Sequence, residues 1–250
     1  MPRFVPPMLL ASGAPRSTVG WVAQPKLDGW RTQVHITDIG VVVWSRHGHR
    51  LDVPELDHLR DTVGVRHVVL DGELVVMAGP VSDFAALQDR MRRGRLGCSH
   101  RLGFVAFDLL AVDGRTMTCE RWDVRRTRLE ELNLRTPAVG VMPVFADVDE
   151  AWHLAETGGW EGIVYKRTAS RWRAGERIND WRLDAIAIAH ADLTRSATVE
   201  GFSRGASPTL LRELLEKAAG APSRHGWLKP VMTPPLKVDR WRSGRIIGVV

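Results

Sequence analysis

Eight residues, Gln24 to Arg31, place several reactive side chains between two apolar runs, in the order Gln-Pro-Lys-Leu-Asp-Gly-Trp-Arg. Lys26 is a candidate nucleophile, because an amine attacks phosphorus once burial or neighbouring cations have removed its proton. Asp28 can orient this amine, Gly29 allows a tight turn, and Arg31 offers a forked donor for a phosphate or a nucleotide sugar. Gln24 opens the stretch. The alternative is a charged hairpin turn.

Two acids interrupt an apolar run at Asp71 and Glu73, within the sequence Val-Val-Leu-Asp-Gly-Glu-Leu-Val-Val. Side chains alternate along a strand, so both carboxylates are expected on one face, where they would serve a metal or a ribose hydroxyl. Gly72, in mid-strand, suits the close approach of a ligand. A hairpin with Asp-Gly at its turn is the structural alternative.

A second acid and lysine bracket an apolar strand at Glu161 and Lys166. Lys166 is a candidate phosphate ligand or else a charge at a strand end. Arg171, Arg173 and Arg177 then follow, interleaved with tryptophan, a pattern that suits a surface tracking a phosphate backbone. A solvated loop is the alternative.

Two further positions complete the candidate set. Arg46 stands in a Ser-Arg-His-Gly turn and is either a functional cation or an exposed hairpin arginine. Phe107 lies in an apolar strand beside Asp108 and is either part of the core or an aromatic platform.

The elements that must position these residues alternate irregularly between strand and helix. Hydrophobic periodicity predicts the strands 21–23, 31–37, 41–44, 68–76, 102–110, 139–145 and 160–166, and the helices 54–63, 83–93, 122–132 and 148–155. Residues 6–10 form a stiff apolar leader expected to lie across a domain surface. This pattern favours an α+β fold with mainly antiparallel sheets.

Composition narrows the class of protein. A chain of 250 residues buries a substantial core, and 35 Lys plus Arg against 29 Asp plus Glu give a net charge of +6, which favours a polyanionic partner. Two cysteines without metal spacing indicate a reducing compartment. No apolar run approaches the roughly 20 residues of a membrane span. We expect a soluble, cytoplasmic protein that binds no membrane.

These motifs, in this order, resemble the ATP-dependent DNA ligases of the covalent nucleotidyltransferase superfamily, especially the compact bacterial repair type. The resemblance covers roughly residues 6–181. The stretch 26–31 is similar to the family's first motif, 71–73 to the third, Phe107-Asp108 to the strand that stacks adenine, and 161–166 to the fourth. Arg46 matches the arginine that follows the first motif.

The resemblance implies a nucleotidyltransferase (ATP-grasp-like) adenylation domain and three phosphoryl transfers. Lys26 takes AMP from ATP, AMP passes to a DNA 5′-phosphate, and the 3′-hydroxyl displaces it. ATP and Mg²⁺ are the implied cofactors, with nucleotide ligands Gln24, Lys26, Arg31, Arg46, Glu73, Phe107 and Lys166, metal ligands Glu73 and Glu161, and DNA ligands Arg171, Arg173 and Arg177. The implied partners are nicked double-stranded DNA and a repair polymerase or nuclease. The implied setting is a monomeric, nucleoid-associated protein of the bacterial cytoplasm.

Two departures from the family pattern bear on turnover. Leu183 and Ala185 occupy the places of the two lysines that in the family face the α-phosphate, and a register slip would instead present Arg182. We expect an adenylation domain over residues 1–191 and a shortened oligonucleotide-binding (OB)-like region over 192–250, since such a barrel needs about a hundred residues. In 192–250 the pattern predicts strands 197–202, 227–231 and 245–250 and a helix over 207–217. The alternatives are a catalytically weakened nucleotide- or DNA-binding paralogue, and an RNA ligase or capping-type enzyme.

Overall fold

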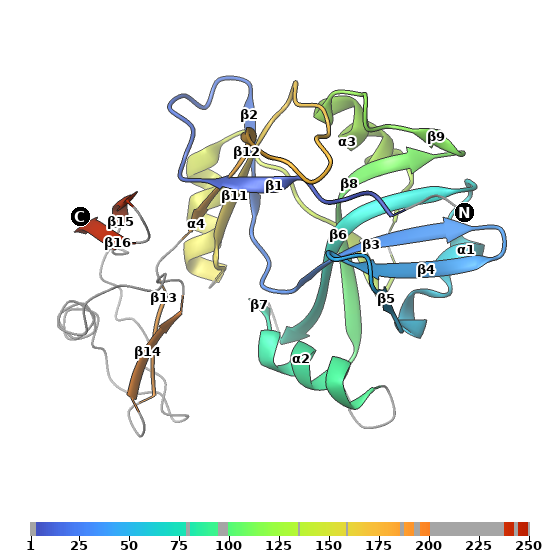
Figure 1. The fold of residues 1–250 in the computed structure, drawn as a ribbon, viewed down its shortest axis with the longest axis horizontal. Helices are drawn as coiled ribbons and strands as arrows, with labels where there is room; N and C mark the ends of the chain where they lie inside the picture. Colours follow the sequence, from blue (N-terminus) through green and yellow to red (C-terminus); the bar gives the residue numbers. More distant parts are fainter. Residues whose placement is uncertain are drawn as a thin grey trace. The chain divides into compact units, whose positions relative to one another are not determined.

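The computed structural model describes residues 4–78, 81–94, 100–134, 136–158, 160–185, 188–192, 196–200, 238–242 and 245–249. The chain divides into two units, Met1–Leu183 and Asp184–Val250, and each is described by itself. The first unit contains both sheets that position the candidate residues (Figure 1).

The larger sheet has the order β10-β8-β6-β3-β4-β5, with β7 paired to β6 and β9 paired to β8. Its strands are β3 (Trp30–Thr37), β4 (Gly40–Ser45), β5 (Arg50–Leu51), β6 (Val68–Ala78), β7 (Val81–Ser82), β8 (Leu102–Val112), β9 (Arg115–Thr116) and β10 (Val139–Val141). Only the β10–β8 pairing among the registers of these described strands is parallel. The prediction of an α+β fold with mainly antiparallel sheets is therefore confirmed.

The smaller sheet has the order β1-β12-β11-β2. Its strands are β1 (Leu9–Ser12), β12 (Arg177–Ala185), β11 (Gly162–Arg167) and β2 (Trp21–Pro25). β2 and β11 pair antiparallel, and β1 pairs parallel with β12. Helix α4 (Val148–Gly158) lies against β2 and β11 (Figure 1).

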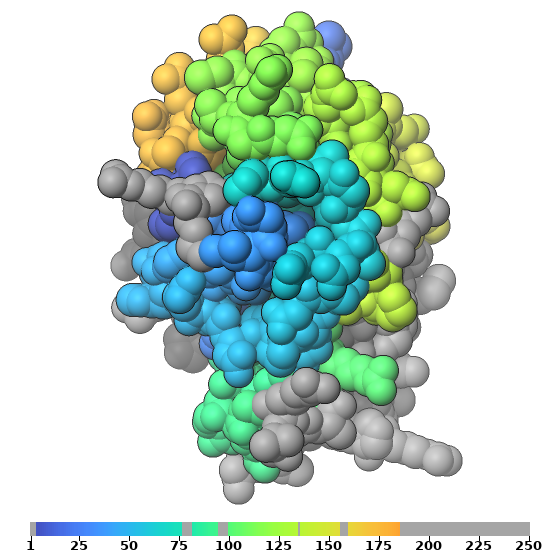
Figure 2. Space-filling model, turned by 90° about the vertical axis from the view of Figure 1, so that its right-hand side faces the viewer, coloured from blue at the N-terminus to red at the C-terminus, as the bar shows by residue number. Residues whose placement is uncertain are grey.

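The main hydrophobic core lies on one face of the larger sheet. It contains Val34 and Ile36 of β3, Leu70 and Leu74 of β6, and Phe104 of β8, together with residues of the helical segments η1 (Pro54–Leu56), α1 (Leu59–Thr62), α2 (Phe84–Arg93) and α3 (Trp122–Glu131). Helix α2 begins after Asp83, whose carboxylate accepts a hydrogen bond from Ala86 N at 2.8 Å, and it buries Leu87 as its spacing predicts. Seen from the side where the β3–β4 and β8–β9 hairpins end, these hairpins and α1 form one continuous surface (Figure 2).

A smaller buried cluster lies on the other face of the larger sheet. It contains Met8, Val69, Leu110, Trp122, Trp172 and Trp181, with Val22 and Phe107 packed against it. The Trp172 and Trp181 rings lie edge to face, with centroids 5.6 Å apart and an angle of 90°. Because Trp172 and Trp181 belong to the β11–β12 segment and Val69 and Leu110 to the larger sheet, this cluster joins the two sheets.

The N-terminal leader crosses from one sheet to the other. Phe4 stacks near Trp44, the Val5 amide donates to Gln33 Oε1 at 3.2 Å, and Met8 is fully buried. β1 then follows β12, where Leu9 N donates to Glu176 O at 2.8 Å. The leader therefore lies across the domain surface, and its last residues add a strand to the smaller sheet.

Two elements differ from the sequence prediction. Residues 54–63 form η1 and then α1 instead of one helix, because Leu56 and Leu59 are both buried at a spacing of three residues, which suits tighter 3₁₀-type turns. The strand expected over 139–145 ends at Val141, two residues before Pro143, which cannot donate to a ladder. Phe145 rejoins the sheet structure only through an isolated bridge to Ala23.

The second unit contains two antiparallel pairs among its described residues. β13 (Ile188–Asp192) pairs with β14 (Ser196–Glu200), and β15 (Val238–Arg242) pairs with β16 (Arg245–Val249). β14 and β16 agree with the strands predicted near 197–202 and 245–250. The helix predicted over 207–217 and the strand over 227–231 lie outside the described residues. The shortened barrel and a boundary at residues 191 and 192 stay predictions.

Candidate active site

Lys26 follows directly after β2, and the neighbouring strand β11 fixes its backbone. Pro25 pairs with Ile163 in the antiparallel register, and Lys26 N donates to Gly162 O at 2.8 Å. The Lys26 Nζ forms an ion pair with Glu161, the residue just before β11. The side chains of Lys26 and Glu161 are 24% and 37% exposed, so both remain open to a ligand. The predicted nucleophile and the predicted metal carboxylate are therefore brought together by one strand pairing.

Asp71 and Glu73 lie on the same face of β6, as predicted. The intervening Gly72 faces the main core, because a Cβ built on it would lie 2.4 Å from the Phe104 ring. The sequence suggested that a ligand approaches this glycine. In the structure a core side chain, Phe104, approaches it instead. Gly29 also serves close packing, since its Cβ would lie 2.5 Å from Leu74 O.

The two β6 acids have different partners. Asp71 is fully buried, and its carboxylate accepts two hydrogen bonds from Arg31, from Nη2 at 2.7 Å and from Nε at 3.3 Å. Glu73 pairs with Arg31 in the backbone register, and burial raises its pKa to about 8 despite the nearby charges of Lys26 and Arg31. Glu73 therefore carries a proton at neutral pH until more positive charge reaches the site.

Phe107 is the extra residue of a β-bulge. Asp71 pairs with Asp108 and Gly72 pairs with Ala106, so Phe107 has no partner across the β6–β8 ladder. Its carbonyl instead accepts a hydrogen bond from Lys166 Nζ at 3.2 Å. The bulge turns the Phe107 side chain away from the main core and into the cluster between the sheets.

Lys166 is enclosed by aromatic rings. Its side chain belongs to a residue only 2% exposed, and Nζ lies 4.0 Å from the Trp181 ring centroid, 4.4 Å from Phe107 and 5.8 Å from Trp122. Burial lowers the pKa of Lys166 to about 7, although Asp108 and Asp71 favour its charged form. Lys166 thus lies against the Phe107 ring and donates a hydrogen bond to the Phe107 carbonyl.

Arg31 is held in place from three sides. Besides the Asp71 fork, its Nη1 donates to Met8 O in the leader at 2.6 Å. The guanidinium lies 5.4 Å from the Phe107 ring centroid and 5.8 Å from that of Trp172. The forked donor expected for a phosphate or sugar is therefore largely engaged by the protein itself.

Gln24 presents a buried amide without a partner. It lies in β2, opposite Val164, and is 2% exposed. Its Nε2 has no hydrogen-bond partner among the described residues. A buried donor left unpaired costs about 1–3 kcal/mol, which favours a ligand that accepts from it.

The four remaining arginines lie apart from this group. Arg46 is exposed in the turn after β4, and Arg171 and Arg173 are exposed in the loop between β11 and β12. Arg177 begins β12, where its Nη1 is hydrogen-bonded to Leu10 O. Contacts from these arginines to Lys26, Glu73 or Glu161 are not found among the described residues.

The strand after the tryptophan has the register expected from the family pattern. Trp181 is 1% exposed and belongs to the cluster between the sheets. Arg182 points the other way, since its Nε donates to Gly13 O at 2.8 Å and its Nη2 to Ser12 O at 2.6 Å. Alternation puts half-buried Leu183 on the Trp181 face. The slipped register that would present Arg182 to the site is therefore wrong.

A buried ion pair beside Phe107 was missed by the sequence analysis. Asp108 and Arg125 are both fully buried, and Arg125 Nε and Nη2 donate to the two Asp108 oxygens at 2.8 Å each. The available signal was the acid Asp108 in an apolar strand, which requires a cationic or hydrogen-bonding partner. Nothing in the sequence pointed to Arg125 among the arginines of its helix.

Comparison with known proteins agrees with this arrangement. The family model described as "ATP dependent DNA ligase domain" matches residues 14–182, well over half of the chain. The chain belongs to the ATP-dependent DNA ligase family. A multifunctional non-homologous end joining DNA repair protein, LigD of Mycobacterium tuberculosis, is 34% identical over 183 residues. That match covers 71% of this chain but only 23% of LigD, so the chain spans about a quarter of that relative's length.

Solved ligase structures share the fold. The ligase domain of M. tuberculosis LigD has a TM-score of 0.66 and 28% identity, covering 97% of this chain and 92% of that one. A mycobacterial DNA ligase D complexed with ATP and MES has a TM-score of 0.65 and 27% identity, with the same coverage of both chains. A prophage-derived DNA ligase-like protein, LigB of Bacillus subtilis, is 31% identical over 71% of this chain and 66% of its own length.

Metal sites, membrane spans and hollows were sought in the part of the chain that the structure describes. The described residues contain no group of three His, Cys, Asp or Glu side chains placed to hold a metal ion. No helix in the described part is long and apolar enough to cross a bilayer.

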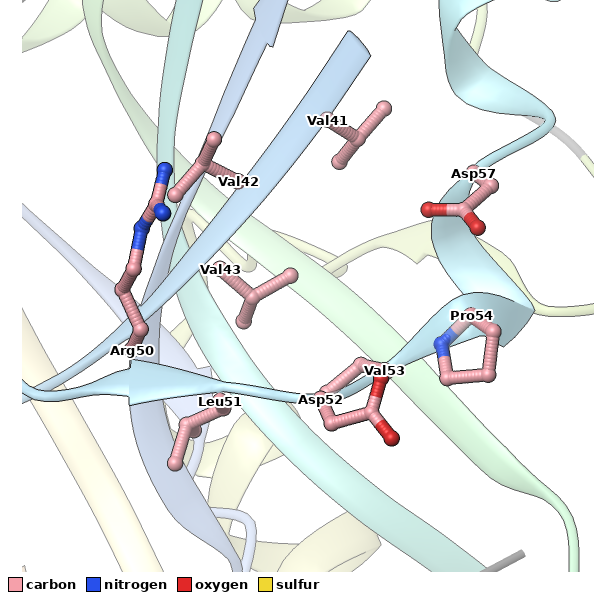
Figure 3. A pocket seen from close by; sticks show the side chains of 9 residues that line it. All are labelled: Val41, Val42, Val43, Arg50, Leu51, Asp52, Val53, Pro54 and Asp57. Atoms are coloured by element: carbon pink, nitrogen blue, oxygen red, sulfur yellow. The ribbon is translucent and has the colours of Figure 1, made fainter.

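A hollow of about 400 Å³ lies at the sheet edge formed by β4, β5 and η1 (Figure 3). Its walls are Val41, Val42, Val43, Arg50, Leu51, Asp52, Val53, Pro54 and Asp57, none of which belongs to the Lys26 site.

Proposed function

We propose that this chain is the adenylyltransferase part of an ATP-dependent DNA ligase that joins nicks in double-stranded DNA during repair or recombination. The carrying observation is the pairing of a partly exposed Lys26 with Glu161, within electrostatic reach of Glu73. A lysine just after a strand, paired with one acid and near a second, suits attack on the α-phosphate of a nucleotide.

Each step is a balanced phosphoryl transfer. The unprotonated Lys26 Nζ attacks the α-phosphorus of ATP, the P–N bond forms, the bond to the β-phosphate oxygen breaks, pyrophosphate leaves and the nitrogen loses one proton to water. A DNA 5′-phosphate oxygen then attacks the lysyl-AMP phosphorus, the P–N bond breaks and the released lysine nitrogen takes up a proton. The DNA 3′-hydroxyl finally attacks the 5′-phosphorus, loses its proton and expels AMP.

The site contains groups suited to binding the base of ATP. Phe107 offers a ring face for stacking, which is worth about 1–3 kcal/mol per base in nucleic-acid complexes. The unpaired Gln24 Nε2 supplies a donor for a ring nitrogen or another acceptor on the base edge. Lys166 supports the Phe107 carbonyl and ring, so we assign it to the base end of the nucleotide rather than to the phosphates.

Mg²⁺ fits the acids of this site. Mg²⁺ commonly takes one or two carboxylates together with substrate phosphates, and Glu161 and Glu73 supply such a pair. Burial raises the pKa of Glu73 to about 8, and a divalent cation beside this carboxyl group would favour its charged form. When bound, Mg²⁺ would neutralise the negative charge that develops on the phosphate oxygens. Glu161 would then exchange its Lys26 contact for the metal, leaving the amine directed at the nucleotide.

DNA contacts are proposed for the exposed arginines. Arg171 and Arg173 extend from the β11–β12 loop, and backbone phosphates are the natural partners of such side chains. Arg177 contributes less, since its guanidinium already donates to the Leu10 carbonyl. The cytoplasm and nucleoid are the setting that this substrate implies.

The deciding experiment is incubation with α-labelled ATP and Mg²⁺, followed by a search for a covalent AMP adduct. An adduct on the wild-type chain and its transfer to nicked DNA support the proposal. A protein that binds ATP and DNA but forms no adduct is a non-catalytic paralogue. Preference for GTP, or for nicked RNA over nicked DNA, would identify a capping-type enzyme or an RNA ligase instead.

A further inference from the structure

We infer that the buried Asp108–Arg125 pair is a positioning device for the nucleotide base, which acts by fixing the bulge that presents Phe107. The inference rests on the proposed function, because it assigns the pair a role in binding ATP. Neither side chain contacts the nucleotide, since both are 0% exposed. The pair is therefore distinct from the residues that hold the base or the phosphates.

The bulge needs a support that the sheet does not supply. At Phe107 the β8 strand carries one residue more than β6, so the regular ladder is interrupted between Asp108 and Ala106. The Phe107 carbonyl is held by Lys166 Nζ at 3.2 Å. After the bulge, the Asp108 carboxylate accepts a hydrogen bond from the Leu109 amide at 2.8 Å, which fixes the backbone there.

Arg125 ties this local geometry to the rest of the domain. Two of its nitrogens hold the Asp108 carboxylate, and Nη1 donates to Glu120 O at 2.8 Å and to Ser170 O at 3.3 Å. Glu120 precedes α3, and Ser170 lies in the loop between β11 and β12. One guanidinium thus connects the bulge to a helix start and to the loop of the smaller sheet.

Stability alone is a poor explanation for such a pair. Replacement of a buried ion pair by apolar residues of similar size is often neutral or stabilising, because two desolvation costs disappear together. What apolar residues cannot reproduce is the direction of the five hydrogen bonds that meet at Asp108 and Arg125. We therefore assign the pair to the geometry of Phe107.

The test replaces both partners at once, as Asp108→Leu with Arg125→Met. Single-turnover adduct formation is measured against ATP concentration, together with the melting temperature. We expect the half-saturating ATP concentration to rise about tenfold or more, as for the loss of a stacked base, with a limiting rate changed less than about threefold. The matched control is Glu55→Leu with Arg90→Met, a similar pair with 18% and 3% side-chain exposure on η1 and α2, which should leave both constants unchanged.

A double-mutant cycle separates positioning from a general loss of structure. In a Phe107→Ala variant, the further change Asp108→Leu with Arg125→Met should raise the half-saturating ATP concentration less than about twofold. The reason is that the pair acts on the base through the Phe107 ring, which this variant already lacks. A full additional loss on that background would overturn the inference. So would a folded double variant that binds ATP like the wild type.

A conservative variant covers the case in which the apolar pair does not fold. Arg125→Lys keeps the charge but loses the forked pair of donors. We expect its melting temperature to lie within a few degrees of the wild type and its half-saturating ATP concentration to rise severalfold. Unchanged ATP dependence in this variant would also overturn the inference. Absence of an adduct in the wild-type chain would instead overturn the proposed function and the inference together.

Discussion

Lys26 and Lys166 are two amines of one site whose surroundings give them different properties. Lys26 is 24% exposed and is paired with a carboxylate, whereas Lys166 belongs to a residue 2% exposed and is surrounded by rings. A nucleophile must reach the phosphorus atom, and only the first of the two is accessible to a ligand. We therefore propose that Lys26 has the reactive role and that Lys166 acts within the protein.

We expect Lys26→Ala to abolish the covalent AMP adduct, because alanine offers no nucleophile. Lys26→Arg keeps the positive charge beside Glu161 and should be equally inactive, since a guanidinium stays protonated. The partial exposure of Lys26 predicts melting temperatures close to that of the wild type. Gel analysis with labelled ATP measures the adduct, and a labelled band from either folded variant would show that another residue is the nucleophile.

At the scale of elements, we propose that β12 sets how many cations meet the α-phosphate. Trp181 faces the cluster between the sheets and Arg182 contacts the leader, so the next residue on the inner face is Leu183. An aliphatic side chain at this place leaves the phosphate end with less positive charge than the family pattern provides.

We expect Leu183→Lys to raise the single-turnover adenylylation rate. One charge-assisted contact made in the transition state is worth about 2.7–4 kcal/mol, or about a hundredfold or more in rate. Rapid-quench measurement of adduct formation tests this, with the melting temperature as a check on folding. The exposed Asn179→Lys, on the same strand, is the matched control. A folded Leu183→Lys variant without a faster rate would contradict the assignment of a cation-poor phosphate end.

Strand pairing could be predicted from the sequence where one face is buried and the other is polar. Val34 and Ile36 alternate with polar residues in β3, and the acids of β6 break an apolar run in a way that fixes their shared face. The short η1 and α1 segments could not be separated, because a three-residue apolar spacing fits both 3₁₀ and α geometry. The end of β10 follows from Pro143, a signal present in the sequence but outweighed by its apolar neighbours.

The candidate site could be predicted as a set of residue types, but its internal contacts could not. The neighbours of Lys26 depend on the β2–β11 pairing, which joins residues 135 positions apart in the chain. The aromatic enclosure of Lys166 depends on Trp122 and Trp181, which no local pattern connects. The Phe107 bulge depends on a one-residue mismatch between β6 and β8, and alternation along one strand cannot reveal it.

At the scale of the whole molecule, the buried Lys166 should make stability depend on pH. Its pKa is about 7 when folded and 10.5 in its ordinary state, so the unfolded chain binds one more proton between these values. The free energy of unfolding should therefore rise as pH increases from about 7 to 10.5 through this group, by on the order of 1.4 kcal/mol per pH unit at most.

Lys166→Met isolates this contribution. Urea unfolding of the wild type and of the variant at pH 7.5 and 9 gives the difference in unfolding free energy, in which the other titrating groups cancel. We expect the wild type to gain relative to the variant at the higher pH. An equal change in both proteins would show that Lys166 stays protonated in the folded state.

DNA binding is also a property of the whole surface, and we expect it to be weak and steeply dependent on salt. Each phosphate contact contributes about one unit to the slope of log affinity against log salt. Arg171→Ala with Arg173→Ala should therefore lower the slope by about two, whereas Arg92→Ala on α2, 74% exposed, should not change it. Fluorescence anisotropy with nicked DNA provides the measurement. A nanomolar complex insensitive to salt would contradict this account.

The two indoles that join the sheets also couple optically. With centroids 5.6 Å apart and ring planes at 90°, the excited states of Trp172 and Trp181 are close enough to mix. Such mixing splits an absorption band into two components that have opposite signs in a circular dichroism spectrum, and this spectrum needs no added label. Because Trp181 also lies 6.2 Å from the Phe107 ring, a base stacked on that ring would disturb the pair directly. If the nucleotide base binds at Phe107 as proposed, the two indoles would report spectroscopically whether that position is filled.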